Sequence, residues 1–158
     1  MTRLRLRASQ AATVGDGVVV RESTLGAEAG RGLYATRTFF RGDWITEYCG
    51  ERIDFAEARR RHDLGRATHI RSVVPLHTAI DGFRQPTKAR GLGGASFAND
   101  GRSSALNNAV FCKVELDGGR VFLRARHTIA RGSEIFVNYG QGYWRPKPHS
   151  VSKSLSHK

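Results

Sequence analysis

A tyrosine at the end of a short apolar strand constrains the fold of this chain more than any other feature. The run Gly132–Trp144 contains the apolar triplet Ile135–Val137, and Tyr139 and Gly140 follow this triplet after one intervening residue. A phenol at the end of a buried strand can point its hydroxyl into a pocket, and the glycine lets the backbone turn sharply away. The pattern indicates a site with aromatic walls, although a tyrosine that simply packs in a core is the commoner arrangement.

Length and composition indicate one domain that is irregular and rich in turns. The chain has 158 residues, 39% of them apolar, and its 18 glycines are spread along the sequence without a repeat. Such a chain is long enough to bury a core, and scattered glycines favour turns over long helices. No apolar run approaches the roughly 18 residues that a membrane span requires, and the basic start lacks the apolar segment of a secretion signal. We therefore expect a soluble intracellular protein.

The cysteines and histidines do not form a metal-binding pattern. Cys49 and Cys112 are far apart in the sequence, and the six histidines are scattered. No CxxC pair is present, so neither a structural zinc site nor a disulfide framework is expected. Because both cysteines have apolar neighbours, we expect two buried free thiols.

The chain is strongly basic. Its 26 lysines and arginines against 14 acidic residues give a formal net charge of +12. Such a charge attracts polyanions and indicates possible contact with nucleic acid, but it also serves solubility without any specific site. The net charge therefore bears on which molecules the protein contacts, and it does not identify a reaction.

The pattern of apolar residues predicts short strands separated by turns, with one helix. Asp54 and Glu57 have the spacing of a capping box, which predicts a helix that runs to about His62. Residues 1–17 are expected to form a flexible basic lead-in and residues 145–158 a basic, disordered tail. The expected strands are Val18–Val20, Leu33–Thr36, Trp44–Tyr48, His69–Val74, Thr78–Asp81, Val110–Leu116 and Arg120–Ala125, the last two as a hairpin around Asp117–Gly119.

One segment of the sequence is repeated in outline. Ala35–Ile45 and Ala125–Ile135 each contain a strand, an Arg-Gly turn and the start of a second strand, and each leads to a tyrosine, Tyr48 or Tyr139. The repeat predicts two similar hairpins. A further interpretation is that two tyrosine hydroxyls are brought to one place.

Several motifs become specific only in combination. Gly30-Arg31-Gly32 is a weak signal by itself, and no GxGxxG or P-loop motif indicates a dinucleotide or triphosphate site. The accompanying segments are Ser23–Ala35, Gly42–Glu51, Ile80–Gly82 with Ser96–Asp100 and Asn107–Ala109, and Gly132–Trp144. In this order and spacing they resemble the SET domain of protein-lysine methyltransferases, over roughly Val18 to Trp144.

The resemblance implies a fold, a cofactor and a set of site residues. The fold is a mainly β, β-clip-like arrangement of several small sheets, in which the closing segment threads through a loop made by the central one. The cofactor is S-adenosylmethionine and the substrate a lysine side chain of a protein. The implied residues are Tyr139 and Tyr48 for catalysis, Gly30, Arg31, Gly32, Asn99, Asp100, Tyr143 and Trp144 for the cofactor, and Val137 and Phe97 for the substrate channel and product specificity.

The sequence departs from the family pattern at three places. Asp100-Gly101-Arg102 follows Asn99 where the family usually has His-Ser-Cys, in a longer loop, and Ser96 stands where an arginine is common. Val137 replaces the usual phenylalanine or tyrosine, and its smaller side chain should leave room for more than one methyl group. No cysteine-rich cluster of the kind that forms zinc modules in many relatives flanks these motifs. Small stand-alone members of the family, viral ones among them, share this feature.

The chemistry that the resemblance implies suits these residue types. Methyl transfer needs a neutral amine, and a free lysine with a pKa of about 10.4 is neutral at pH 7 only at a cost of roughly 4–5 kcal/mol. Desolvation and the adjacent sulfonium reduce this cost, so no separate base is required. We expect a histone-like basic tail as the target, docked by strand addition, and a chromatin-associated enzyme. The alternatives are a catalytically degenerate SET module and a basic nucleic-acid binder.

Overall fold

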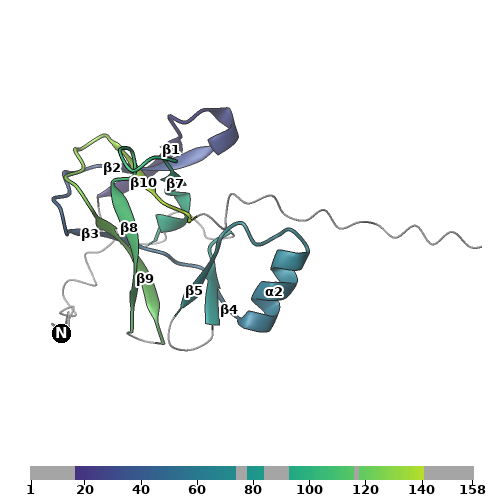
Figure 1. The fold of residues 1–158 in the computed structure, drawn as a ribbon. Helices are drawn as coiled ribbons and strands as arrows, with labels where there is room; N and C mark the ends of the chain where they lie inside the picture. The colour runs from purple at the N-terminus through teal and green to yellow at the C-terminus, as the bar shows by residue number, and fades with distance from the viewer. Residues whose placement is uncertain (1–16, 74–77, 84–92, 116–117, 141–158) are drawn as a thin grey trace, which may run out of the picture.

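The chain folds into several small sheets with one helix beside them (Figure 1). The computed structural model describes residues 17–73, 78–83, 93–115 and 118–140. Within these ranges the elements are mostly strands, which confirms the predicted mainly β architecture of the SET domain. The predicted lead-in before Gly17 and the predicted tail lie outside the described residues.

The first sheet brings three of the sequence motifs together. It contains β1 (Val18–Glu22), β2 (Arg31–Ala35), β10 (Glu134–Val137) and β7 (Asn99–Asp100), in the order β1-β2-β10-β7. Strand β10 runs antiparallel to β2 and parallel to β7. The closing motif therefore lies between the strand of the glycine motif and the strand of the central motif.

Two further sheets complete the described fold. The second contains β3 (Trp44–Glu47), β9 (Arg120–Ala125) and β8 (Ala109–Val114), and the third contains β4 (Glu51–Asp54), β6 (Thr78–Asp81) and β5 (Ile70–Val73), each in the order given. The predicted hairpin is present as β8 and β9, with Val114 opposite Arg120. The sequence pattern did not predict β4 or the two-residue β7. Strand β5 forms one edge of the third sheet and is shorter than expected.

The helix α2 (Phe55–Asp63) begins where the capping box predicts. The backbone N–H of Glu57 donates to Oδ1 of Asp54 at 2.7 Å, which satisfies one of the free N–H groups of the first turn. None of the helical residues is buried, and the helix lies beside the third sheet (Figure 1). Two short 3₁₀ turns are present, Ala27–Ala29 between β1 and β2 and Ala95–Phe97 before β7.

The two copies of the repeated segment pair with each other. The backbone N–H of Phe39 donates to the carbonyl of Ile129 at 2.9 Å, and the N–H of Ile129 returns the bond at 2.8 Å. Gly42 and Gly132 have φ angles of 91° and 87°, a conformation that favours glycine at both turns. The repeat in the sequence is therefore a pair of similar turns whose core residues meet across a short antiparallel bridge.

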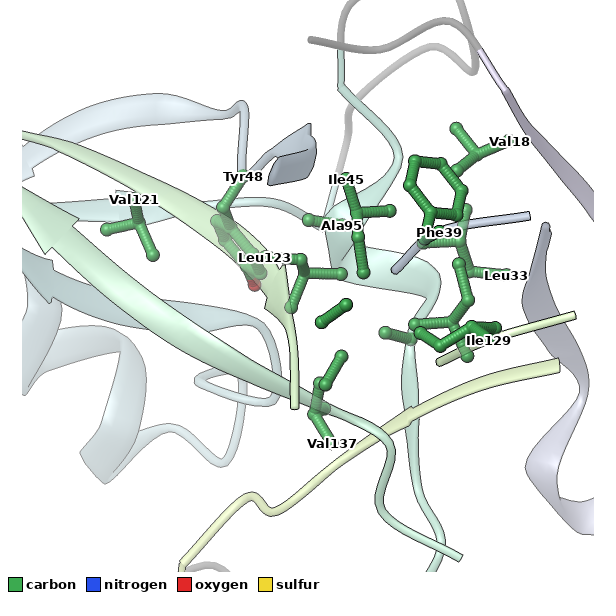
Figure 2. Packing of buried hydrophobic residues seen from close by; sticks show 14 of the residues in the cluster. Val18, Leu33, Phe39, Ile45, Tyr48, Ala95, Val121, Leu123, Ile129 and Val137 are labelled. Atoms are coloured by element: carbon green, nitrogen blue, oxygen red, sulfur yellow. The ribbon is translucent and has the colours of Figure 1, made fainter. Parts of the chain in front are cut away.

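The core is formed by apolar residues from all three sheets, from the paired turns and from the segment before β7. Figure 2 shows Val18, Leu33, Phe39 and Ile129 at one end of this cluster and Tyr48 and Val121 at the other. Leu33, Phe39, Ile45, Leu123, Ile135 and Val137 are fully buried. Each such side chain stabilises the fold by about 1.5–3 kcal/mol through burial.

The two cysteine thiols are less buried than the sequence predicts. Cys49, between β3 and β4, and Cys112, on β8, are free, as expected, but both are only partly buried. Burial, followed by the charge of Glu47, raises the pKa of Cys49 to about 11. Burial also raises the pKa of Cys112, so both thiols stay protonated at neutral pH. The described residues contain no group of three potential metal ligands and no helix long and apolar enough to cross a membrane.

Candidate active site

The closing strand is clamped by an asparagine side chain from the central loop. Oδ1 of Asn108 accepts a hydrogen bond from the N–H of Phe136 at 2.9 Å, and Nδ2 of Asn108 donates to the carbonyl of Glu134 at 3.0 Å. The backbone N–H of Asn108 also donates to the carbonyl of Phe136 at 3.1 Å. One side chain thus ties the central loop to the backbone of β10.

Asp100, one of the residues that depart from the family pattern, holds the central loop together. Oδ1 of Asp100 accepts from the N–H of Arg102 at 2.7 Å, and Oδ2 accepts from the N–H of Tyr139 at 3.0 Å. Asn107 completes the loop by accepting from the N–H of Gly101 at 2.8 Å. The buried carboxylate of Asp100 therefore positions the backbone of the tyrosine directly, so the unusual Asp-Gly-Arg sequence forms an ordered loop around β10.

The two tyrosine hydroxyls are each held by a main-chain carbonyl. The hydroxyl of Tyr139 donates to the carbonyl of Ala98 at 2.8 Å, and that of Tyr48 donates to the carbonyl of His69 at 2.6 Å. Gly82 lets the chain pass close to Tyr48, since a Cβ there would lie 3.0 Å from the hydroxyl oxygen. Both phenols are thus fixed in orientation by hydrogen bonds to the main chain.

An arginine and a phenylalanine lie between the two phenols. The ring of Tyr48 meets that of Phe111 edge-on, with 5.8 Å between centroids. The guanidinium carbon of Arg71 lies 3.9 Å from the centroid of Phe111 and 5.6 Å from that of Tyr139. Tyr48 and Tyr139, which follow the two repeated segments, therefore belong to one cluster of aromatic rings that also contains the guanidinium of Arg71.

Tyr139 also faces a cavity of about 550 Å³ that Asn99 and Asp100 line. The loop after β1 contributes Leu25, Glu28 and Ala29 to the same wall, and the segment before β5 contributes Thr68 and His69. This volume is in the range of small-molecule sites in proteins. Glu28, Asp100 and Arg102 give the wall charged residues of both signs. Such a wall suits a ligand that also carries both charges, such as S-adenosylmethionine with its sulfonium, ammonium and carboxylate groups.

The backbone at the glycine motif is open enough for a ligand to approach it closely. Gly30, directly after Ala29, has a φ angle of 62° and has open space where a Cβ would lie. Asn99 ties the motif to the cavity, because its Nδ2 donates to the carbonyl of Arg31 at 2.9 Å. The residues present therefore fit a cofactor in this cavity.

Glu134 is a structural residue of the site that the sequence interpretation missed. Its carboxylate accepts hydrogen bonds from Ser23 Oγ at 2.7 Å, from Thr24 N at 2.8 Å and from Thr24 Oγ1 at 2.5 Å. Gly32 must be a glycine here, since a Cβ would lie 2.1 Å from Oε1 of Glu134. A charged residue inside an apolar strand was the signal that could have identified it.

The electrostatics of Glu134 follow from these contacts. Burial raises the pKa of this carboxyl, but the hydrogen bonds from Thr24 and Ser23 outweigh burial and hold the pKa below its ordinary value. The carboxylate is thus ionised at neutral pH. It fixes the loop that leads to Leu25 and the cavity wall, and it connects that loop to the closing motif.

His69 is a second residue that the sequence did not single out. It lines the cavity with Tyr139, and its ring packs against Phe83 at a centroid distance of 5.5 Å. Burial lowers the pKa of His69, and Asp81 opposes this change in part. The imidazole is therefore neutral at pH 7. No sequence signal identified it, because its place depends on the packing of the third sheet.

The remaining predicted site residues occupy different places. Val137 is fully buried within the core cluster, and Phe97 is half-buried and packs against that cluster. Tyr143 and Trp144, the predicted cofactor lid, lie outside the described residues. The roles assigned to these four residues stay predictions.

Comparison with known proteins agrees with this geometry. The family model described as SET domain matches residues 30–140, which is well over half of the chain. A humanized mutant of the Chaetomium thermophilum Polycomb Repressive Complex 2 bound to an inhibitor is 25% identical, with a TM-score of 0.61, and the match covers 78% of this chain and 15% of that one. An active polycomb repressive complex 2 in the basal state shares the fold at 22% identity, a TM-score of 0.61 and the same coverage.

A related structure of the autoinhibited complex contains S-adenosylmethionine. It is 24% identical, with a TM-score of 0.61, over 78% of this chain and 15% of that one. This chain thus spans about 15% of the length of the structures that it resembles. S-adenosylmethionine is the cofactor that SET methyltransferases use, which agrees with the predicted cofactor. From its sequence motifs, its arrangement of small sheets and the family match, this chain belongs to the SET domain family.

Proposed function

We propose that this chain transfers methyl groups from S-adenosylmethionine to the side-chain amine of a lysine in a protein. The observation that supports this most is the fixed position of Tyr139 at the wall of the cavity. Its backbone N–H is held by Asp100 and its hydroxyl by the carbonyl of Ala98. A phenol that is fixed at both ends can orient a small reacting group with little loss of freedom on binding.

The tyrosines would orient the amine, and the apolar rings would exclude water from it. Tyr139 and Tyr48 present hydroxyls that can accept from or donate to an amine, while the ring of Phe111 suits the alkyl stem of a lysine. When bound, the cofactor supplies an electrophilic methyl group. The amine loses its proton to water before transfer, so a strong base is not needed among these residues.

The cofactor would lie between the glycine motif and the central motif. Gly30, Arg31 and Gly32 would supply backbone groups, and Asn99 and Asp100 would hold the opposite side. Glu134 would act as a positioning residue, since it fixes the loop after β1 through Ser23 and Thr24. The prediction that Tyr143 and Trp144 cover the adenine belongs to the same proposal.

A histone tail is the substrate class that we propose. The structures with the same fold belong to a Polycomb Repressive Complex 2, and among the described residues β5 forms an edge of its sheet beside the cluster at Tyr139. An extended peptide can add to such an edge through main-chain hydrogen bonds. The charge of +12 does not favour a basic tail by itself, but it suits an enzyme that contacts nucleic acid on chromatin in the nucleus.

Transfer of label from S-adenosylmethionine tests this function. The protein is incubated with radiolabelled cofactor and core histones and, separately, with an unfractionated lysate, and mass spectrometry then locates the mark. We expect methyl-lysine. Label on arginine would contradict the family assignment of the substrate residue.

The second candidate is a SET module that binds a partner without catalysis. The replacement of the usual central motif by Asp100-Gly101-Arg102 motivates it. Calorimetric titration with S-adenosylmethionine separates the two candidates, because an enzyme must bind the cofactor. No detectable heat of binding, with the protein folded, would favour the binding module.

A further inference from the structure

The paired turns form a surface outside the proposed active site. Residues 35–43 and 125–133 run antiparallel, and backbone hydrogen bonds join them at three places. The joined pairs are Ala35 with Ser133, Phe39 with Ile129, and Asp43 with Ala125. None of the residues of these two segments lines the cavity at Tyr139, so the segments present a surface of their own.

Four exposed arginines gather on the two segments because of this pairing. Arg37 and Arg131 lie on opposite segments between the first and second joined pairs, and Arg41 and Arg126 lie between the second and third. Arg41 and Arg131 occupy equivalent places, each directly before the glycine of its turn. We call the exposed basic and aromatic residues of these segments the paired-turn surface, which consists of Arg37, Phe40, Arg41, Arg126, His127 and Arg131.

The positive charge of this surface is only partly balanced within the two segments. None of the four arginines forms an ion pair with another residue that the structure describes. Asp43 is the acidic residue of the two segments, and its carboxylate accepts a hydrogen bond from the backbone N–H of Phe40 at 2.8 Å. Four arginines therefore stand against one carboxylate that already closes a turn.

The neighbouring charged residues do not reverse this balance. Asp100 lines a cavity of about 540 Å³ together with Arg126, but Arg102 lines the same cavity and offsets its charge. Glu134 follows the second segment and is buried, where its carboxylate accepts hydrogen bonds from the loop after β1. Arg124 of β9 adds a cation beside the first turn, since its Nε donates to a carbonyl of that turn at 2.8 Å. A surface of this kind attracts a polyanion.

Phe40 adds an exposed aromatic ring to the paired-turn surface. Phe40 is 65% exposed, whereas Phe39 beside it is fully buried. It begins the first turn, in which the N–H of Asp43 donates to its carbonyl at 2.9 Å, and Arg41 follows it directly. An aromatic ring among arginines suits a ligand that carries both negative charge and aromatic faces of its own.

We propose that the paired-turn surface binds single-stranded nucleic acid, with phosphates on its arginines and a base stacked on Phe40. Arginine binds phosphate through two parallel hydrogen bonds, and any base can stack on an aromatic side chain. In a duplex the neighbouring base pairs cover the faces of the bases, whereas a single strand leaves them accessible. This binding is separate from the proposed methyltransferase function and does not depend on it.

Fluorescence anisotropy with labelled oligothymidylate of about 20 nucleotides tests the stacking. Phe40→Ala should weaken binding by about 5- to 100-fold, the effect expected when one stacked base is lost. Phe83→Ala is the matched control, because Phe83 is 66% exposed but follows β6 of the third sheet. Both side chains are exposed, so neither change should lower the melting temperature. Equal affinities of the two variants for oligothymidylate would overturn the proposal.

The dependence of the affinity on salt tests the arginines. Arg41→Gln/Arg131→Gln removes two charges from the paired-turn surface, and Arg59→Gln/Arg66→Gln removes two exposed charges from α2 and the segment after it. The slope of log affinity against log salt should become shallower by about 1.4 in the first variant, at about 0.7 for each phosphate contact. The second variant should keep the slope of the unaltered protein. The same change in both would show that net charge alone governs binding and would contradict the proposal.

A duplex and an acidic polypeptide distinguish this partner from others. Phe40→Ala should leave the affinity for a duplex of the same length unchanged, because covered bases cannot stack on the ring. Polyglutamate of the same total charge should displace oligothymidylate only weakly, since its side chains supply no ring to stack. An equal loss of affinity for single strand and duplex, or full displacement by polyglutamate, would overturn the assignment of a single strand.

Discussion

Hydrogen bonds to two other residues fix Tyr139, the proposed catalytic residue. Tyr139 is held by Asp100 through its backbone and by Ala98 through its hydroxyl. Asp100 replaces the family's usual histidine, yet it performs a clear structural task. The unusual central motif is therefore compatible with an ordered site.

Removal of the Tyr139 hydroxyl is expected to abolish methylation without unfolding the protein. Tyr139→Phe should lower kcat by at least about 100-fold, because a misplaced amine loses the benefit of orientation. Binding of S-adenosylmethionine and the melting temperature should change little. Tyr34→Phe is the matched control, since it loses hydrogen bonds to Glu22 and Glu134 but lies away from the cluster. Comparable activity loss in both variants would argue against a specific role for Tyr139.

Glu134 should make the free energy of unfolding depend on pH. Its pKa is lowered in the folded state, so the stabilisation is present above the unfolded pKa of about 4.3 and is lost as pH falls through the folded value. Glu134→Gln should lower the free energy of unfolding by about 2 kcal/mol at pH 7. Urea denaturation from pH 7 to pH 3 should show the two proteins converging below about pH 4. A constant difference across this range would contradict the assignment.

At the scale of elements, the central loop and β10 form one unit. Asn108 connects them by two hydrogen bonds to the backbone of Glu134 and Phe136. The strand order β2-β10-β7 then joins the glycine motif, the closing motif and the central motif. The site thus depends on this strand order more than on any one strand.

Loss of the Asn108 side chain should release the closing strand. Asn108→Ala leaves a buried N–H and a carbonyl unpaired, which should lower the free energy of unfolding by about 2–4 kcal/mol. Asn138→Ala is the control, because Asn138 is exposed and its side chain accepts a hydrogen bond from the N–H of Gly140, two residues away. Hydrogen exchange of the amides of β10 should increase in the first variant and not in the second. Equal protection in both would show that the clamp is not needed.

The elements were predictable to the extent that they carry local signals. The capping box identified the start of α2, and the Asp-Gly-Gly turn identified the hairpin of β8 and β9. Strand β7 has two residues and becomes a strand only by pairing with β10, so a local pattern could not predict it. Arg71 and His69 likewise reach the site through sheet pairing, which the sequence does not encode locally.

At the scale of the whole molecule, the positive charge should govern contact with nucleic acid. A net charge of +12 predicts weak binding to DNA of any sequence, with an affinity that falls steeply as salt rises. Fluorescence anisotropy with two unrelated duplexes, from 50 to about 200 mM salt, should give equal affinities and parallel slopes. A strong preference for one sequence, or no dependence on salt, would contradict this prediction.

The central claim is that this SET domain methylates lysine through the hydroxyl of Tyr139. The most direct measurement is mass spectrometry of core histones after incubation with S-adenosylmethionine and either the unaltered protein or Tyr139→Phe. We predict methyl-lysine at a defined position with the unaltered protein and its loss with the folded, cofactor-binding variant. An unmodified histone fraction and lysate, or an equal mark from both proteins, would contradict the account.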